Sequence, residues 1–211
     1  MYVPPAFAVD RDSALAMAEA RGFGLLVAFD GTRPVGAHLP FILARVGDTV
    51  RLGFHVARTN RIAELANGER EMLMAVAGTD AYISPDWYTS KDQVSTWLYE
   101  AVHLSGPVRR LGLEGHLGHV DALSAKFEKR LLPKKPWTSD KMTPQRREAM
   151  LRGIVAMEME VRLVEGARKL NQHKSEADRN AVIVALSGRP ESGSQQISRL
   201  MRGLKDQGTQ S

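Results

Sequence analysis

The sequence contains no cysteine. That absence excludes disulfide bonds, thiolate catalysis and zinc or iron–sulfur sites built on cysteine, so any redox chemistry needs a bound cofactor. No apolar run approaches the roughly 20 residues that cross a bilayer, and residues 1–5 have neither the basic flank nor the apolar stretch of a signal peptide. We therefore expect a cytoplasmic protein with no membrane partner.

Aromatic residues are also scarce, at 6% of the chain. Nevertheless, two of the three tryptophans and three of the four tyrosines fall between Ala81 and His103. Tyr and Trp combine a large apolar face with one polar atom, which suits the wall of a site for a planar polar ligand. A buried core hairpin would use the same residue types, so the sequence alone leaves both interpretations open.

Apolar residues make up 43% of the 211-residue chain, which is enough for a substantial core. The formal net charge of +5 favours anionic partners such as phosphates or nucleic acid.

Residue patterns and turn residues predict a chain rich in strands. The turns at Asp30-Gly31 and Gly47-Asp48 are typical of connections between antiparallel strands. Strands are predicted over residues 23–29, 35–44, 49–56, 71–77, 81–84, two pieces within 93–110, and 154–164. Helices are predicted over residues 11–20, 113–132, 143–151 and 179–186, with one or two helical turns in 61–67.

Six or seven antiparallel strands with peripheral α-helices indicate a small β-barrel, because closure removes exposed strand edges. We expect residues 1–188 to form this mainly β domain with its helical additions. Residues 189–211 are predicted to form a C-terminal helix and a flexible tail.

The segment from His55 to Asn60 is a candidate phosphate site, because it joins a predicted strand to a short helix. Arg58 offers a bidentate fork, His55 a donor and Asn60 a further hydrogen bond. Alternatively, Asn60 only caps the helix and Arg58 is a solvated charge.

Two further segments combine polar groups with unusual backbone chemistry. His38, Leu39 and Pro40 lie in an otherwise apolar strand, where proline cannot donate to a ladder and so implies an edge, a bulge or a ligand on neighbouring backbone groups. Lys169 and Gln172 belong to a polar stretch that could reach a phosphate or a ring edge. Alternatively, His38 is a core or surface histidine whose hydrogen bonds are made within the protein. The stretch with Lys169 and Gln172 would then only connect a strand to a helix.

The sequence gives no clear signal for a metal site, a Rossmann nucleotide site, a serine hydrolase or a DNA-binding helix. The six histidines show no known zinc spacing, although His116 and His119 are three residues apart. There is no G-x-G-x-x-G between a strand and a helix, and no G-x-S-x-G elbow. Basic residues between Lys126 and Arg152 could face DNA, but they alternate with acidic residues, as on a solvated helical face.

The segments MYVPPAF, HLPF, GFHVARTN, DAYISPDWYTSK, TWLYEAVH and KLNQH occur in order along the chain. Together they resemble the PaiB-like family, which is described as FMN-binding negative transcriptional regulators. The resemblance implies a split β-barrel of the pyridoxamine-phosphate-oxidase type, a homodimer, and FMN held between its subunits.

The resemblance also implies roles for individual residues. His55, Arg58 and Asn60 would hold the phosphate of FMN. The segment His38, Leu39 and Pro40, with Trp87 and Trp97, would line the flavin ring, and Lys169 with Gln172 would complete the site.

The chain departs from the family pattern at Leu98, where an amide residue is usual, and at Asn171 and His173. Loss of one hydrogen-bonding partner in a buried site costs roughly 1–3 kcal/mol, which predicts weaker FMN binding. The leading hypothesis is an FMN-binding regulator to which the sequence assigns no reaction. The alternatives are a flavin-dependent oxidoreductase and a flavin-free dimer that binds DNA.

Overall fold

The computed structural model describes residues 1–207. The chain forms two compact, interleaved units. Unit 1 contains Met1–Ala14, Ala77–Val102 and the chain from Glu165 onward, and unit 2 contains Leu15–Val76 and His103–Val164.

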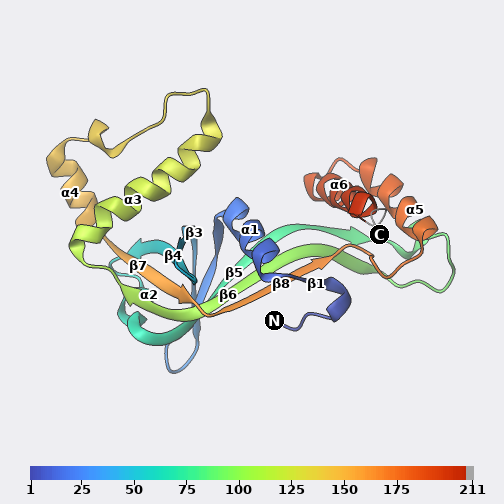
Figure 1. Cartoon of the computed structure of the whole chain (residues 1–211), viewed down its shortest axis with the longest axis horizontal. Helices are drawn as coiled ribbons and strands as arrows, with labels where there is room; N and C mark the ends of the chain where they lie inside the picture. The colour runs from blue at the N-terminus through green and yellow to red at the C-terminus, as the bar shows by residue number, and fades with distance from the viewer. Residues whose placement is uncertain (208–211) are drawn as a thin grey trace. The chain divides into compact units, whose positions relative to one another are not determined.

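Strands dominate the fold, as Figure 1 shows. Across residues 1–207 the strands are β1 (Ala8–Val9), β2 (Phe23–Phe29), β3 (Pro34–Val46), β4 (Thr49–Ala57), β5 (Asn67–Ile83), β6 (Thr96–Arg110), β7 (Ile154–Val161) and β8 (Leu163–Lys169). The α-helices are α1 (Arg11–Arg21), α2 (Arg61–Leu65), α3 (Leu113–Glu128), α4 (Pro144–Arg152), α5 (Glu176–Ser187) and α6 (Ser192–Gln207). Short 3-10 helices span Pro5–Phe7, Pro85–Trp87, Lys129–Leu131 and Ser139–Lys141.

The sheet closes on itself. Its strand order is β1-β8-β6-β5-β2-β3-β4-β7, and β6 also pairs with β7. The closing register places Val108 opposite Met159 and Arg109 opposite Glu158. Six strands, β2 to β7, therefore form a barrel, and the predicted mainly β barrel with peripheral helices is confirmed.

Gly106 allows β6 and β7 to approach closely at this closure. A Cβ atom at Gly106 would lie 1.8 Å from the carbonyl oxygen of Glu160. The chain then leaves β7 with a backbone hydrogen bond of 2.9 Å from the Arg162 amide to the Ser105 carbonyl. Glycine is required here because no side chain fits between the two backbones.

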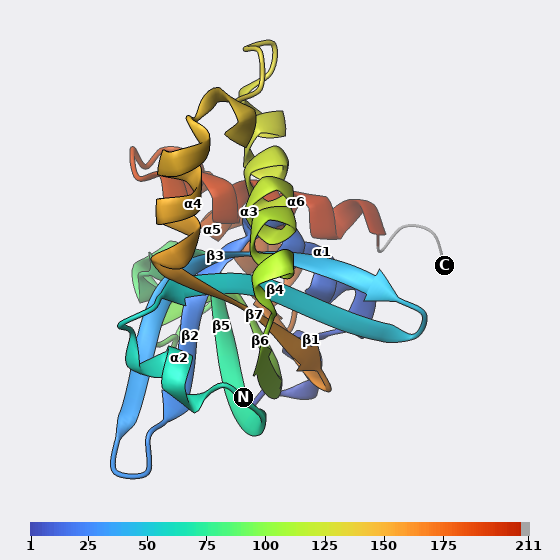
Figure 2. The same cartoon turned by 90° about the vertical axis from the view of Figure 1, so that its left-hand side faces the viewer.

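Alternating apolar residues fill the core of unit 2. Because successive side chains of a strand point to opposite faces, one face of each strand supplies this core. Its largest fully buried side chains are Leu26, Phe41, Leu52, Phe54, Ile62, Met74, Leu104, Met157 and Met159. Helix α3 packs against β3 and β7 on the outside of the strands, and α4 also contacts β7 (Figure 2).

Unit 1 has its own hydrophobic core. Ile83 and Leu98 from β5 and β6 meet Leu170, which follows β8, and α5 and α6 pack side by side against them (Figure 1). The full cluster is Ala81, Ile83, Tyr88, Leu98, Leu170, Val182, Ile183, Leu186, Ile197 and Met201.

Strand β5 changes its inward-facing positions along its length. Met72, Met74 and Val76 are buried, whereas further along the buried residues are Ala81 and Ile83. The switch from even to odd positions falls where the strand passes from unit 2 to unit 1, at Ala77. The sequence pattern therefore looked like two separate strands, although the strand is continuous.

Two further strand predictions needed correction. Residues 154–164 were expected to form one strand, but the chain breaks at Arg162 and continues as β8. Strand β1 was not predicted, because its two residues are recognised only through their pairing with Ala167 and Gly166.

Helix α6 lies within the residues predicted to form a C-terminal helix and tail. Ile197 and Met201 of α6 are completely buried in the core of unit 1. The predicted flexible tail falls partly on residues 208–211, which lie outside the described residues, and the domain boundary at 188/189 stays a prediction. Among residues 1–207, no helix is both long and apolar enough to span a membrane.

Candidate functional site

The aromatic segment divides into exposed and buried residues. Tyr82 and Trp97 are 48% and 54% exposed, and their rings meet edge to face with 6.0 Å between centroids. Tyr88 and Leu98 are buried in the core of unit 1. The core interpretation therefore applies to Tyr88, whereas the ligand-wall interpretation stays a prediction for the exposed pair Tyr82 and Trp97.

Trp87 and Tyr88 pack into unit 1. Trp87 is half-buried against the hydrophobic cluster. The Asn171 side-chain amide donates to the Tyr88 hydroxyl at 3.1 Å, and burial raises the pKa of Tyr88. Asn171 adopts a φ of 61°, a left-handed conformation that asparagine tolerates better than most residues. Asn171 therefore has a clear structural role, while its effect on FMN affinity stays a prediction.

Lys169 lies in a cationic and aromatic cluster of unit 1. Its Nζ donates to Thr96 Oγ1 at 2.6 Å and lies 5.9 Å from the centre of the Phe7 ring. The Phe7 ring meets His173 edge to face at 5.5 Å. Burial, Lys174 and Lys169 lower the pKa of His173. A hydroxyl and a ring leave the charge of Lys169 unneutralised, which suits an anionic or electron-rich ligand.

Thr96 and Trp97 begin β6 as neighbours in the chain. Because successive side chains of a strand point to opposite faces, the Lys169–Thr96 contact and the exposed Trp97 belong to different faces. Leu98 is fully buried in the core. Its apolar side chain therefore suits the packing, and its effect on FMN affinity stays a prediction.

Gln172 organises the turn after β8. Its Oε1 accepts from the Leu170 amide at 2.7 Å, and its Nε2 donates to the Arg168 carbonyl oxygen. These bonds fix the backbone that follows Lys169. The structure thus gives Gln172 a turn-forming role next to the predicted ligand residue.

Asp178 holds the loop before β6, a role that the sequence did not reveal. Its carboxylate accepts hydrogen bonds from the amides and hydroxyls of Thr89 and Ser90, at 2.8–3.0 Å. The Ser90 amide and the Thr89 hydroxyl hold the pKa of Asp178 far below its usual range. Ser175 caps α5 by accepting from the Asp178 amide, whereas the Asp178 carboxylate turns towards the loop.

Arg58 and Asn60 lie at the end of β4 in unit 2. Arg58 donates through Nε to the Arg152 carbonyl at 2.6 Å and through Nη2 to the Ile154 carbonyl at 3.0 Å. Asn60 Oδ1 accepts from the Ile62 amide at 2.9 Å and caps α2. The capping interpretation therefore applies to Asn60, while Arg58 fastens β4 to the junction between α4 and β7.

His55 forms part of a histidine cluster in unit 2. His55 Nδ1 lies 3.2 Å from His119 Nε2 on α3, and burial lowers the pKa of both histidines. His116 Nε2 accepts from the Ala156 amide at 3.4 Å, and its buried Nδ1 lacks a hydrogen-bond partner. Across residues 1–207, no group of three or more histidine or acidic side chains has an arrangement that could hold a metal ion.

In β3, the side chain of Leu39 lies on the opposite face from those of His38 and Pro40. His38 is exposed, with its ring stacked on Phe23 at 6.4 Å, whereas Leu39 is buried in the core. Pro40 pairs with Phe23, and β3 pairs with β4 only from Phe41 onward. The missing amide of Pro40 therefore falls just outside the β3–β4 ladder.

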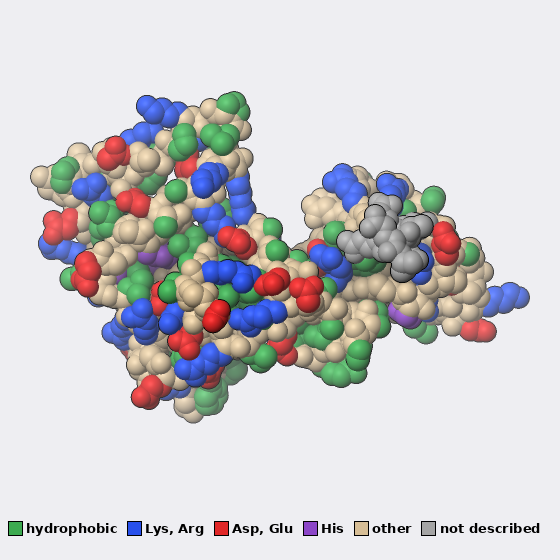
Figure 3. Space-filling view, viewed as in Figure 1, with side chains coloured by type: hydrophobic (Ala, Val, Ile, Leu, Met, Phe, Trp, Pro, Cys, Tyr) green, Lys and Arg blue, Asp and Glu red, His purple; other side chains and the backbone are tan. Residues whose placement is uncertain are grey.

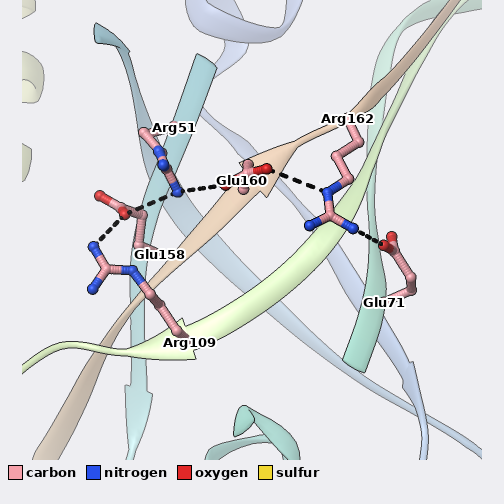
Figure 4. Close-up of polar contacts among 6 residues, drawn as sticks. All are labelled: Arg51, Glu71, Arg109, Glu158, Glu160 and Arg162. Carbon is pink, nitrogen blue, oxygen red and sulfur yellow. Dashed lines mark hydrogen bonds and ion pairs between the residues drawn. The ribbon is translucent and has the colours of Figure 1, made fainter. Parts of the chain in front are cut away.

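An alternating chain of charges runs across β4, β5, β6 and β7 of unit 2 (Figure 4). Glu158 contacts Arg109 at 2.8 Å and Arg51 at 3.6 Å. The chain continues from Arg51 through Glu160 to Arg162 and ends at Glu71. Arg109 and Arg51 thus share one half-buried carboxylate on the outer side of the barrel.

Residues 1–163 match the family model described as "Putative FMN-binding domain". The chain belongs to this family. It is 29% identical over 202 residues to "Protease synthase and sporulation protein PAI 2" of Bacillus subtilis, which covers 95% of this chain and 96% of that protein. The PaiB-like resemblance is confirmed, and with it FMN as the cofactor of this split barrel.

Solved structures support the same fold. The FAD- and haem-binding protein of Mycobacterium smegmatis superposes with a TM-score of 0.54 at 16% identity, over 76% of this chain and 71% of that chain. The flavocytochrome Anf3 of Azotobacter vinelandii gives a TM-score of 0.53 at 14% identity, over 77% and 69%. At these identities the similarity shows the fold alone.

Each unit by itself offers groups of the kind that a flavin mononucleotide uses. Its ring needs a flat apolar surface with polar groups at the edge, and its phosphate needs cationic or N–H donors. In unit 1, Tyr82 and Trp97 offer exposed ring surface, and Lys169 offers a cation. In unit 2, Arg58 uses two of its five N–H groups on carbonyl oxygens, so its exposed guanidinium keeps donors for an anion.

Proposed function

We propose that this protein is a homodimeric, cytoplasmic regulator whose state depends on bound FMN. The observation that carries the proposal is the exposed Tyr82–Trp97 pair in a member of an FMN-binding family. Exposed apolar surface that gathers in one place is a feature of ligand and partner sites. Bound FMN supplies reversible electron transfer, while these residues bind and orient its ring.

The ring contact is assigned to Trp97, with Tyr82 supporting it. Tyr82 fixes the Trp97 ring edge to face, so the indole offers a surface with little remaining freedom. Trp87 is a weaker candidate, because it already packs against the core of unit 1. His38, Leu39 and Pro40 keep their predicted place near the ring as a hypothesis, in which exposed His38 is the strongest member.

The phosphate contact is assigned to Arg58, with His55 and Asn60 as supporting residues. Arg58 is exposed and retains N–H donors after it binds the carbonyls of Arg152 and Ile154. Those two bonds hold the guanidinium in place, which reduces the entropy lost when an anion binds. Lys169 and Gln172 keep their predicted ligand role as a hypothesis, although the Lys169–Thr96 contact lies on the face of β6 opposite to Trp97 and both amide atoms of Gln172 bond the backbone of the turn.

The regulatory part of the proposal comes from the relative. Its name connects that protein to protease synthesis and sporulation. A homodimer with DNA as a further partner is consistent with a regulatory role and with the net charge of +5. Sedimentation of the purified protein with and without FMN tests the dimer, and a monomer under both conditions would remove that part.

Titration of FMN into the purified protein tests the proposal as a whole. We expect the flavin fluorescence to fall on binding, because an aromatic ring stacked on the flavin quenches its emission. Trp97→Leu should weaken binding by roughly 10- to 100-fold, which corresponds to about 1–3 kcal/mol. Trp137→Leu, on the segment between α3 and α4, is the matched control and should bind as the unmodified protein does.

Arg58→Ala tests the phosphate role separately. It should weaken FMN by about tenfold or more but leave riboflavin, which lacks the phosphate, almost unaffected. Arg61→Ala removes a neighbouring exposed cation and serves as its control. Equal losses for FMN and riboflavin would assign Arg58 to structure alone, and no binding of either flavin would remove the flavin part of the proposal.

A further inference from the structure

Helices α5 and α6 form a pair joined by a short turn in unit 1. Four residues separate them, and these include Gly188 and Pro190. The helices pack against each other, and the Ser198 hydroxyl of α6 donates to the Ile183 carbonyl of α5 at 3.1 Å. Two packed helices joined by a short turn that contains glycine occur in αα-hairpins and in helix-turn-helix units.

The inner face of α6 is held firmly. Ile197 and Met201 are buried in the hydrophobic core of unit 1. Near the start of the helix, a Cβ atom at Gly193 would lie 2.4 Å from the Asp80 carbonyl oxygen of β5, and Thr79 Oγ1 lies 3.4 Å from the Gly193 carbonyl. The orientation of α6 on its unit is therefore fixed, and one face remains available for a partner.

The outer face of α6 carries amide and guanidinium groups. Gln196, Arg199 and Arg202 are all exposed and recur at three-residue intervals, so they follow one side of the helix. The sequence from Ser192 to Leu204 contains no acidic residue. Figure 3 shows Lys and Arg side chains over the α5–α6 pair. This face is complementary to a polyanion, and Arg and Gln are the side chains that pair bidentately with guanine and adenine.

The basic side chains of the α3–α4 segment in unit 2 are used differently. Lys134 and Arg152 pair with Glu128 and Glu148. Other cations donate to backbone carbonyl oxygens, including Lys126 to Phe41, Arg130 to Ala20 and Lys141 to Pro136. These internal contacts favour a structural role for that segment, although it holds more positive charges than α6.

We propose that α6 is the DNA-contacting element of this protein and that its outer face enters the major groove of duplex DNA. This inference rests on the proposed regulatory function and names the surface that performs it. Arg199 and Arg202 contact phosphates or guanines, and Gln196 reads a base edge. Helix α5 packs against the inner side of α6 and holds it in place, as the first helix of a helix-turn-helix does for the second.

The test uses the full-length protein and duplexes selected by that protein from a pool with random centres. Binding is followed by fluorescence anisotropy over a range of salt concentrations. The double variant Arg199→Ala/Arg202→Ala should bind at least tenfold more weakly, and the slope of log affinity against log salt should fall by about 1.8, because each lost phosphate contact removes about 0.9. Arg146→Ala/Arg147→Ala on α4 removes the same charge and should bind as the unmodified protein does.

Gln196→Ala separates sequence reading from charge. It should relax the preference among selected duplexes and leave the salt slope unchanged. Thermal melting of every variant confirms that it folds, and FMN titration of the same samples reports on the flavin site independently. If the α4 variant loses binding while the α6 variant keeps it, α6 is not the contact and the regulatory proposal survives.

Absence of any duplex binding by the unmodified protein, with FMN bound normally, would overturn this inference and leave the flavin assignment intact. Capture of a protein partner by the α6 face with no affinity for DNA would overturn it as well.

Discussion

His55 Nδ1 and His119 Nε2 lie 3.2 Å apart and join β4 to α3. A hydrogen bond between two imidazoles needs one nitrogen to donate and the other to accept, so doubly protonated rings cannot keep it. Burial, reinforced by His55 and His116, lowers the pKa of His119 to about 4. Burial and His116 also lower the pKa of His55. The contact therefore needs at least one of the two histidines to be neutral.

Folding stability should fall in mild acid because of this cluster. The unfolded chain takes up a proton on His119 near pH 6.5, whereas the folded chain takes it up only near pH 4. The contribution of neutral His119 to the free energy of unfolding is therefore fully present above pH 6.5 and is lost as the pH drops towards 4. The loss between pH 7.5 and pH 5 is about 2 kcal/mol. Urea denaturation at both pH values measures this loss.

His119→Gln should flatten that pH dependence, while His38→Gln, which changes an exposed ring stacked on Phe23, should leave it unchanged. An unchanged pH dependence in the His119 variant would exclude the cluster as its origin.

The closure of the barrel predicts a pair of opposite glycine effects. Gly106→Ala places a methyl group against the Glu160 carbonyl oxygen and should destabilise the fold by about 3 kcal/mol. Gly118→Ala, on the exposed side of α3 where nothing lies within 4 Å, should be neutral or stabilise by up to about 1 kcal/mol through helix propensity. Denaturant titrations of both variants compare them, and equal effects would contradict the close approach of β6 and β7.

The alternating charges in Figure 4 should contribute unequally to stability. Glu158 forms ion pairs with both Arg51 and Arg109, and its side chain is 22% exposed. Glu158→Gln should therefore lower the free energy of unfolding by about 1 kcal/mol. Arg162 lies nearer the other end and is 60% exposed, so Arg162→Gln should stay within about 0.5 kcal/mol. Thermal melts at low and high salt measure both variants. A larger loss for Arg162 would show that exposure does not set these energies.

Removal of the Asp178 carboxylate should release the loop before β6. Asp178→Ala deletes four hydrogen bonds to Thr89 and Ser90, so the amides of these residues should exchange with solvent at least about tenfold faster. Ser175→Ala removes only the α5 cap and should leave both amides protected. Hydrogen exchange read by NMR gives the two amides separately, and unchanged exchange in the Asp178 variant would contradict the anchoring role.

Much of the fold could be predicted because its signals are local. The Asp30-Gly31 and Gly47-Asp48 turns mark the β2–β3–β4 meander within one or two residues of its observed bounds. The helix predicted over residues 179–186 is present as α5, which begins three residues earlier, at Glu176. Strand β1 and the continuity of β5 could not be predicted, because pairing with distant residues defines β1 and the buried face of β5 changes along the strand.

The candidate site was predictable only in part, for the same reason. Arg58 was recognisable as a cation after a strand, but its bonds to the Arg152 and Ile154 carbonyls depend on residues more than ninety positions away. The partnership of Asp178 with Thr89 is similarly non-local. The sequence shows which hydrogen bonds or charges a side chain can offer. Tertiary packing determines which residue becomes its partner.

The interleaving of the two units constrains how the chain can be synthesised and divided. The first fourteen residues share unit 1 with the final helices, whereas unit 2 is assembled from two inner segments. On the ribosome, unit 2 can complete its strands before α5 and α6 have emerged, while the N-terminal segment must wait for them. Neither unit is a contiguous stretch, so a single cut releases neither, and gene fusions are best made at the termini.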